Sequence, residues 1–170
     1  REYVSALEHQ AEKLRFLIDA LVKTSRLESG VLAMTPKRHG IQQLLDAASA
    51  QAAPGAEAKA ITLTVEPTDL TARFDPKWTA EALYNLVDNA VKYTPAGGAV
   101  TLRAVGYELF CRVDVTDTGP GIPESEQARI FQRFYRSPSA SEAEGVGIGL
   151  YLARQIAAGQ GGYLKVSSRP

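Results

Sequence analysis

The sequence has little cysteine, no excess of charge of either sign and no long apolar run. Its single cysteine, Cys111, excludes an internal disulfide and a cysteine-based zinc cluster. The 19 basic residues are balanced by 19 acidic ones, which disfavours a nucleic-acid partner or a disordered tail. No run approaches the roughly 20 apolar residues that span a bilayer, and no charged-then-apolar leader opens the chain. At 170 residues and 45% hydrophobic composition, we expect one globular domain with an appended helix.

The first 28 residues contain neither proline nor glycine. Leu7, Leu14, Ile18 and Val22 recur there at helical spacing, which predicts a long amphipathic helix that ends at Ser29-Gly30. The apolar stripe of this helix is expected to pack against another apolar surface. Two alternatives stay open: the stripe packs on its own domain, or it forms half of a helical bundle.

The rest of the chain mixes helices and strands without regular alternation. An Asp75-Pro76 pair is a good helix start, because aspartate caps the first turn and proline fits the first helical position. We expect three helices, over 41–53 closed by Pro54-Gly55, from 75 to about 92, and over 147–158. The expected strands are 61–65, 72–74, the two arms of a hairpin at 99–105 and 109–116, and one that begins at 163–166. A long loop is expected over 119–144. This order predicts an α+β fold with an antiparallel or mixed sheet and helices on one face.

Asn85, Asn89 and Lys92 are spaced to lie on one face of their helix. Carboxamide oxygens are hard, neutral ligands that suit Mg²⁺, and the lysine can offset phosphate charge. Asparagines on a helix are often merely solvated. Here, however, the apolar residues of 83–91 already supply a stripe facing the core, which leaves the polar set aligned on the other side.

Two glycine clusters follow this helix. Asp117 precedes Gly119 and Gly121, and this pattern suits an adenine whose amine donates to the carboxylate, although an ordinary turn uses the same residues. The second cluster, Gly145-x-Gly147-x-Gly149, opens a helix, where free N–H groups attract phosphate. It has neither the dinucleotide-binding spacing nor a Walker A lysine.

Between the glycine clusters, 130–136 combines aromatic and basic side chains. Such a segment can fold over bound nucleotide, with Phe131 and Phe134 packing and Arg133 and Arg136 available for phosphate. A local hydrophobic contact that only fixes the loop is the alternative.

These ordered segments resemble the ATP-binding catalytic domain of sensor histidine kinases, in the superfamily shared with gyrase-type ATPases, mismatch-repair proteins and a chaperone class. Residues 85–93 resemble the N box, 117–122 the first glycine box, 131–134 the F box and 145–150 the second glycine box. The resemblance implies a two-layer α/β sandwich of the Bergerat type, with a mixed, mostly antiparallel five-stranded sheet backed by three helices.

The resemblance also implies roles for single residues. Asn89 would be the principal Mg²⁺ ligand with Asn85 beside it, and the catalytic set would be Asn85, Lys92 and Arg136. The ATP-binding set would be Asn85, Asn89, Lys92, Tyr93, Asp117, Gly119, Gly121, Ile122, Phe131, Gly145, Gly147, Gly149 and Leu150.

Hydrolysing members of the superfamily carry a glutamate where Asn85 stands. A carboxamide cannot take a proton from water, which favours phosphoryl transfer over rapid hydrolysis, although Glu81 lies one turn earlier. His9 and His39 lack the acid and proline that follow the family's phosphoacceptor histidine. We therefore expect a fragment that binds nucleotide and does not phosphorylate itself.

The domain boundary that this resemblance implies lies near residue 30. Residues 1–30 would be the second helix of the dimerisation and phosphoacceptor domain, and 31–170 a catalytic domain truncated at its C-terminus. The implied partners are ATP, the phosphoacceptor helix, a response regulator and a second copy, in the cytoplasmic part of a membrane-anchored bacterial sensor. Two alternatives use the same fold: an anti-sigma-type serine kinase and a nucleotide-binding scaffold.

Overall fold

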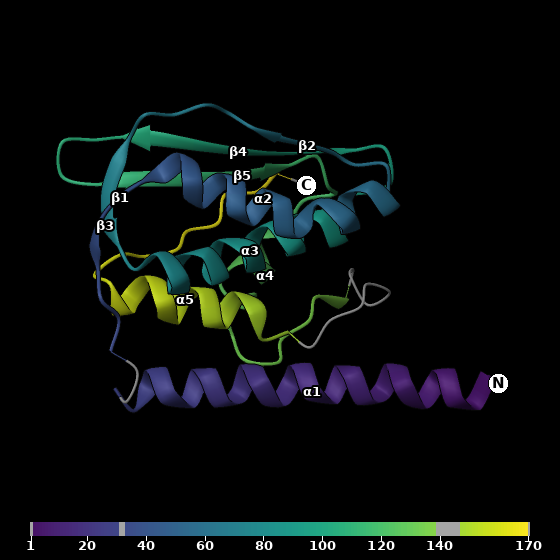
Figure 1. The fold of residues 1–170 in the computed structure, drawn as a ribbon. Coiled ribbons are helices and arrows are strands. Elements are labelled where there is room, and N and C mark those ends of the chain that lie inside the picture. Colours follow the sequence, from purple (N-terminus) through teal and green to yellow (C-terminus); the bar gives the residue numbers. More distant parts are fainter. Residues whose placement is uncertain (1, 31–32, 139–146, 170) are drawn as a thin grey trace.

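The structure is a computed structural model that describes residues 2–30, 33–138 and 147–169. A sheet forms the first layer, helices α2 (Ile41–Ala58) and α3 (Pro76–Tyr93) cover one face of it, and α5 (Gly149–Gly159) packs against α3 on the side away from the sheet (Figure 1). The long helix α1 (Glu2–Glu28) lies outermost, next to α5. The expected α+β class with three backing helices is confirmed.

The five strands form two sheets instead of the single sheet that we expected. Strands β2 (Thr62–Val65), β4 (Ala99–Gly106) and β5 (Cys111–Asp117) form one sheet in the order β2-β4-β5. The β2-β4 pair is parallel and the β4-β5 pair antiparallel, so this sheet is mixed. Strands β1 (Lys37–Gly40) and β3 (Thr71–Phe74) form a separate antiparallel pair.

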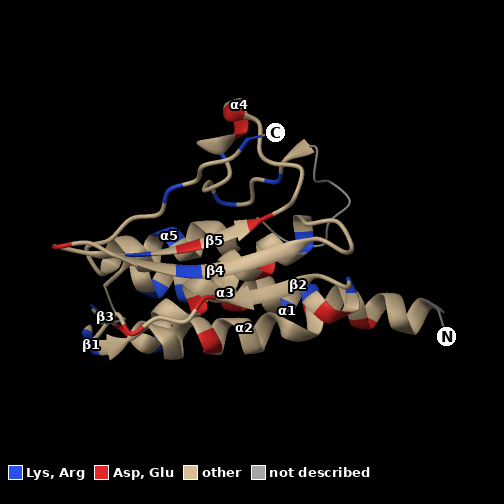
Figure 2. Ribbon diagram, turned by 90° about the horizontal axis from the view of Figure 1, so that it is seen from above, with Lys and Arg blue, Asp and Glu red and all other residues tan. Residues whose placement is uncertain are grey.

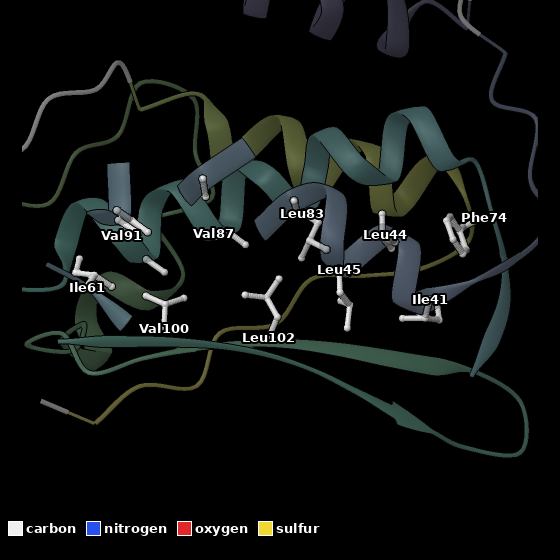
Figure 3. Packing of buried hydrophobic residues seen from close by; sticks show 14 residues of the cluster. Ile41, Leu44, Leu45, Ile61, Phe74, Leu83, Val87, Val91, Val100 and Leu102 are labelled. Carbon is white, nitrogen blue, oxygen red and sulfur yellow. The ribbon is translucent and has the colours of Figure 1, made fainter. Parts of the chain in front are cut away.

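The core lies between the sheet and helices α2 and α3 (Figure 3). Leu45, Val87, Val100 and Leu102 have essentially no exposed surface there. Burial of apolar surface is the main source of stability, so this layer fixes α3 on the sheet. Cys111 is half-buried at the edge of the same core, as expected of a packed strand residue.

Helix α1 has 27 residues and is followed two residues later by Gly30, whose φ of +68° is the left-handed conformation that glycine favours. Near its C-terminal end, Ala20 and Thr24 are buried, whereas apolar residues nearer its N-terminus such as Leu7 and Leu14 are exposed. Among the described residues, no helix is long and apolar enough to cross a membrane. Basic and acidic positions are interspersed over the elements (Figure 2).

Three further expectations were wrong. Strand β1 was missed, because Lys37-Arg38-His39-Gly40 has no apolar alternation and forms only by pairing with β3. Helix α2 continues through Pro54 to Ala58, since Ala52 and Ala56 are buried on both sides of the proline.

The third wrong expectation is the strand at 163–166. Residues 162–169 join neither sheet. Instead, Ser168 is tied to the loop after β5 through its hydroxyl, which accepts a 2.7 Å hydrogen bond from the Ile122 amide.

Candidate functional site

Helix α3 carries the polar face expected from the sequence. Asp75 caps its start by accepting hydrogen bonds from the Lys77 and Trp78 amides at 3.0 and 3.1 Å. Its apolar side chains are buried, and Asn85 and Asn89 lie half-buried on the remaining face. Within the described part of the chain, neither carboxamide makes a hydrogen bond to another side chain or to the backbone, so both remain available to a ligand.

The last turn of α3 is held by two lysines. Lys59, just beyond α2, donates to the carbonyls of Val91 and Lys92, both at 2.8 Å, which satisfies terminal carbonyls and suits the negative end of the helix. Lys92 itself forms an ion pair with Asp88 at 2.8 Å, one turn earlier. The position of Lys92 is therefore fixed at both its backbone and its ammonium group.

The first glycine cluster packs against the end of α3. The Asp117 carboxylate accepts a 2.8 Å hydrogen bond from the Gly119 amide and is exposed at the end of β5. A Cβ on Gly119 would lie 3.2 Å from the Tyr93 carbonyl oxygen, so only glycine allows this approach without a shift. Gly121 has a φ of +79°, the left-handed region.

The second glycine cluster contacts both the polar face and the aromatic segment. A Cβ on Gly149 would lie 3.6 Å from the carboxamide of Asn85, so the N-terminus of α5 faces this side chain across a glycine-sized space. Gly147 has a φ of +75°, and a Cβ there would lie 2.6 Å from the Tyr135 carbonyl oxygen. Leu150 lies half-buried in the first turn of α5. Gly145 lies outside the described residues.

The aromatic and basic segment is tied to α1 and α5. The Arg133 guanidinium contacts the Glu28 carboxylate, donates to the Tyr151 hydroxyl at 2.9 Å and lies 4.7 Å from the centre of the Tyr151 ring. The Tyr151 hydroxyl also donates to Glu28. Hydrogen bonds from Tyr151 and then Arg133 lower the pKa of Glu28 below its ordinary value. Sequence reasoning missed this cluster.

The other predicted residues of this region have their own contacts. Arg136 is half-buried. Phe131 lies beneath Arg154 of α5, with 5.8 Å from the guanidinium carbon to the ring centre. Ile122 contacts Ser168, as described above.

The structure thus brings together Asn85 with Gly149, Tyr93 with Gly119, and the aromatic segment with Gly147. Two cavities between described residues lie elsewhere, one beside His39 and Phe74 and one between Glu124 and Ser168. The described part of the chain also has no group of three or more His, Cys, Asp or Glu side chains placed to hold a metal. The carboxamides of Asn85 and Asn89 stay the predicted metal ligands.

Comparison with known proteins identifies the arrangement. Residues 74–170 match the model of the histidine kinase-, DNA gyrase B-, and HSP90-like ATPase family. The chain belongs to this family. Within it, the chain is an ATP-binding catalytic domain of the histidine kinase type, as its relatives show.

Among curated relatives, the adaptive-response sensory kinase SasA of Synechococcus sp. (strain JA-3-3Ab) is 33% identical over 99% of this chain and 45% of that protein. The sensor protein CreC of Escherichia coli (strain K12) is 34% identical over 87% of this chain and 31% of that protein. Among solved structures, full-length ShkA in complex with AMPPNP has a TM-score of 0.80 and 29% identity, over 95% of this chain and 34% of that one.

The chain therefore spans less than half the length of these family members. The similarity extends over α1 as well, because the matches to SasA and ShkA cover nearly the whole chain.

Proposed function

We propose that this chain binds Mg²⁺-ATP and transfers the γ-phosphoryl group to a histidine that is not part of it. The observation that carries the proposal is the meeting of three segments at α3. Asn85 faces the N-terminus of α5 across Gly149, and the Tyr93 carbonyl contacts Gly119. An ATP site needs this combination of a metal-binding face, a phosphate-binding helix terminus and a loop for the base. The complex of ShkA with AMPPNP, an analogue of ATP, supports the choice of nucleotide.

The two carboxamides fit a magnesium ion. Asn85 and Asn89 are half-buried and keep their oxygens uncommitted within the described residues, and glycine at 149 leaves room beside Asn85. Asn89 would be the main ligand and Asn85 the second. When bound, the ion would neutralise phosphate charge and orient the transferred group. Lys92 and Arg136 would contribute positive charge, and Asp117 would accept from the adenine amine.

Phosphoryl transfer is favoured over hydrolysis by the side chains around Asn85. Asn85 itself cannot act as a base. Glu81, one turn earlier, forms a 2.7 Å ion pair with Lys23 of α1, so its carboxylate already has a cationic partner. Neither of the chain's histidines suits the acceptor role, since the His39 ring packs 5.5 Å from that of Phe74 and His9 lacks the following acid.

Residues 1–30 would be the second helix of a dimerisation and phosphoacceptor domain, with 31–170 as the catalytic part. The exposed apolar residues of α1, among them Leu7, Leu14 and Ile18, support a helical bundle whose other helices are not in this chain. As the family resemblance implies, we propose that the whole protein is a dimeric, membrane-anchored bacterial sensor whose catalytic part is cytoplasmic. It would pass phosphate to a response regulator.

The test has two steps. First, titration with ADP or AMPPNP should show binding that tightens with Mg²⁺, and Asn89→Ala should lose most of that tightening. Second, γ-labelled ATP should label a separately supplied helical hairpin bearing an acceptor histidine, and should leave this chain unlabelled. Label on this chain itself, or steady phosphate release without acceptor, would contradict the proposal. Binding that is insensitive to magnesium would instead favour a scaffold.

A further inference from the structure

Asp88 is an acidic side chain on the polar face of α3 that the proposed function does not use. It follows Asn85 by one turn, precedes Asn89 directly and pairs with Lys92 at 2.8 Å. Both side chains of the pair are about one third exposed, at 30% for Asp88 and 34% for Lys92. The face that would meet ATP therefore carries one negative and one positive charge, already in contact with each other.

A purely structural role explains this pair poorly. An acid four residues before a lysine on a partly exposed helix surface contributes little to stability. Helix α3 is held elsewhere, by the Asp75 cap at its start, by Lys59 at its end and by the buried side chains of its other face.

We propose that Asp88 is a positioning residue that holds the Lys92 ammonium and makes nucleotide binding depend on Mg²⁺. This inference rests on the proposed function. A polyphosphate without metal has to draw Lys92 away from Asp88 and lies near a carboxylate, both of which oppose binding. A magnesium ion reverses the second effect, because its hydration shell can donate hydrogen bonds to the same carboxylate. The pair thus selects the metal complex of the nucleotide over the free nucleotide.

The test is Asp88→Asn, which removes the charge and keeps the size of the side chain. Dissociation constants for ADP would be measured by calorimetry with excess Mg²⁺ and with a chelator. We expect the variant to bind metal-free ADP about fivefold to tenfold more tightly, while the constant with Mg²⁺ changes by less than about twofold. The matched control is Asp46→Asn on the exposed face of α2, which removes the charge of a carboxylate that accepts a 2.8 Å hydrogen bond from Gln42 four residues earlier.

A second variant shows whether Asp88 acts through Lys92. In a Lys92→Met background, Asp88→Asn should tighten metal-free binding by a smaller factor than in the parent chain, because only the repulsion between carboxylate and phosphate then remains and a double-mutant cycle isolates the pairwise term. An unchanged effect in that background, or no effect in either, would overturn the inference. So would weaker binding only with Mg²⁺, which would make Asp88 a metal ligand. If the parent chain binds no ADP at all, the proposed function fails instead. Thermal melting of each variant checks that the fold is kept.

Discussion

Asp75 joins three parts of the chain, and its removal tests the reasoning about α3. Its side chain is 6% exposed. One carboxylate oxygen caps α3 through the Lys77 and Trp78 amides, and the other accepts from the Thr35 amide at 2.9 Å. Its own amide donates to Gln160 at the end of α5, at 2.6 Å.

Asp75→Ala should lower the free energy of unfolding by about 2–3 kcal/mol. Loss of an aspartate cap costs about 1–2 kcal/mol, and the bond to the exposed Thr35 contributes roughly 1 kcal/mol more. For a chain of this size, the melting temperature should fall by about 4–12 °C. Asp75→Asn keeps one acceptor oxygen and should lose about half as much. Urea unfolding followed by circular dichroism at neutral pH measures both.

The same substitution has a pH signature. Burial alone would raise the pKa of Asp75, but hydrogen bonds from Thr35, Trp78 and Lys77 outweigh it and lower the pKa below its ordinary value. A lowered pKa in the folded state stabilises the fold above the unfolded pKa, and this stability is lost as the pH falls through the folded value. The difference between parent and Asp75→Ala should therefore be constant above about pH 5 and shrink below about pH 4.

Asp46→Ala, on the exposed face of α2, is the control and should change stability by less than about 0.5 kcal/mol. A loss below about 0.5 kcal/mol for Asp75→Ala would refute the account of the cap. A difference as large at pH 3 as at pH 7 would show that the carboxylate charge is not what matters.

Three further measurements test the core, the second glycine cluster and the contact between α1 and the domain. Leu102, which has no exposed surface, tests the core: Leu102→Ala should lower the free energy of unfolding in urea by about 2–5 kcal/mol. Its control, Leu109→Ala at a residue that is 92% exposed, should lower it by less than about 0.5 kcal/mol. Gly147→Ala should weaken ADP binding about tenfold or more, while Gly161→Ala, which shares the positive φ but has open space around its Cβ, should leave binding unchanged. The Glu28 carboxyl should titrate by NMR below its ordinary value of 4.5, because its tyrosine and arginine partners favour the charged form, and a titration at or above that value would contradict the contact.

Much of α3 was predictable because its signals are local. The cap and proline at Asp75-Pro76 and the spacing of Asn85, Asn89 and Lys92 all lie within one helix. The i,i+4 spacing of Asp88 and Lys92 is equally local, but spacing alone does not show that the lysine pairs with this carboxylate instead of extending into solvent.

The features that the sequence did not predict depend on contacts between residues that lie far apart in the chain. Strand β1 exists only through its register with β3, in which Lys37 pairs with Phe74. The proline of α2 is tolerated because the alanines around it are buried on the core, a gain that a local rule for proline does not include. The contacts of Glu28 with Arg133 and Tyr151 join residues 105 and 123 positions apart, and no spacing in the sequence indicates them.

Helix α1 is attached to the domain at the two places where the candidate site begins and where its aromatic segment lies. Lys23 forms an ion pair with Glu81, one turn before Asn85, and Glu28 forms one with Arg133. Exposed ion pairs of this kind are individually weak, and the buried surface of α1 is confined to its C-terminal part, around Ala20 and Thr24. A rotation of α1 about its axis would have to expose Ala20 and Thr24 as well as break both pairs, so the buried residues contribute more than the ion pairs to holding α1 on the domain.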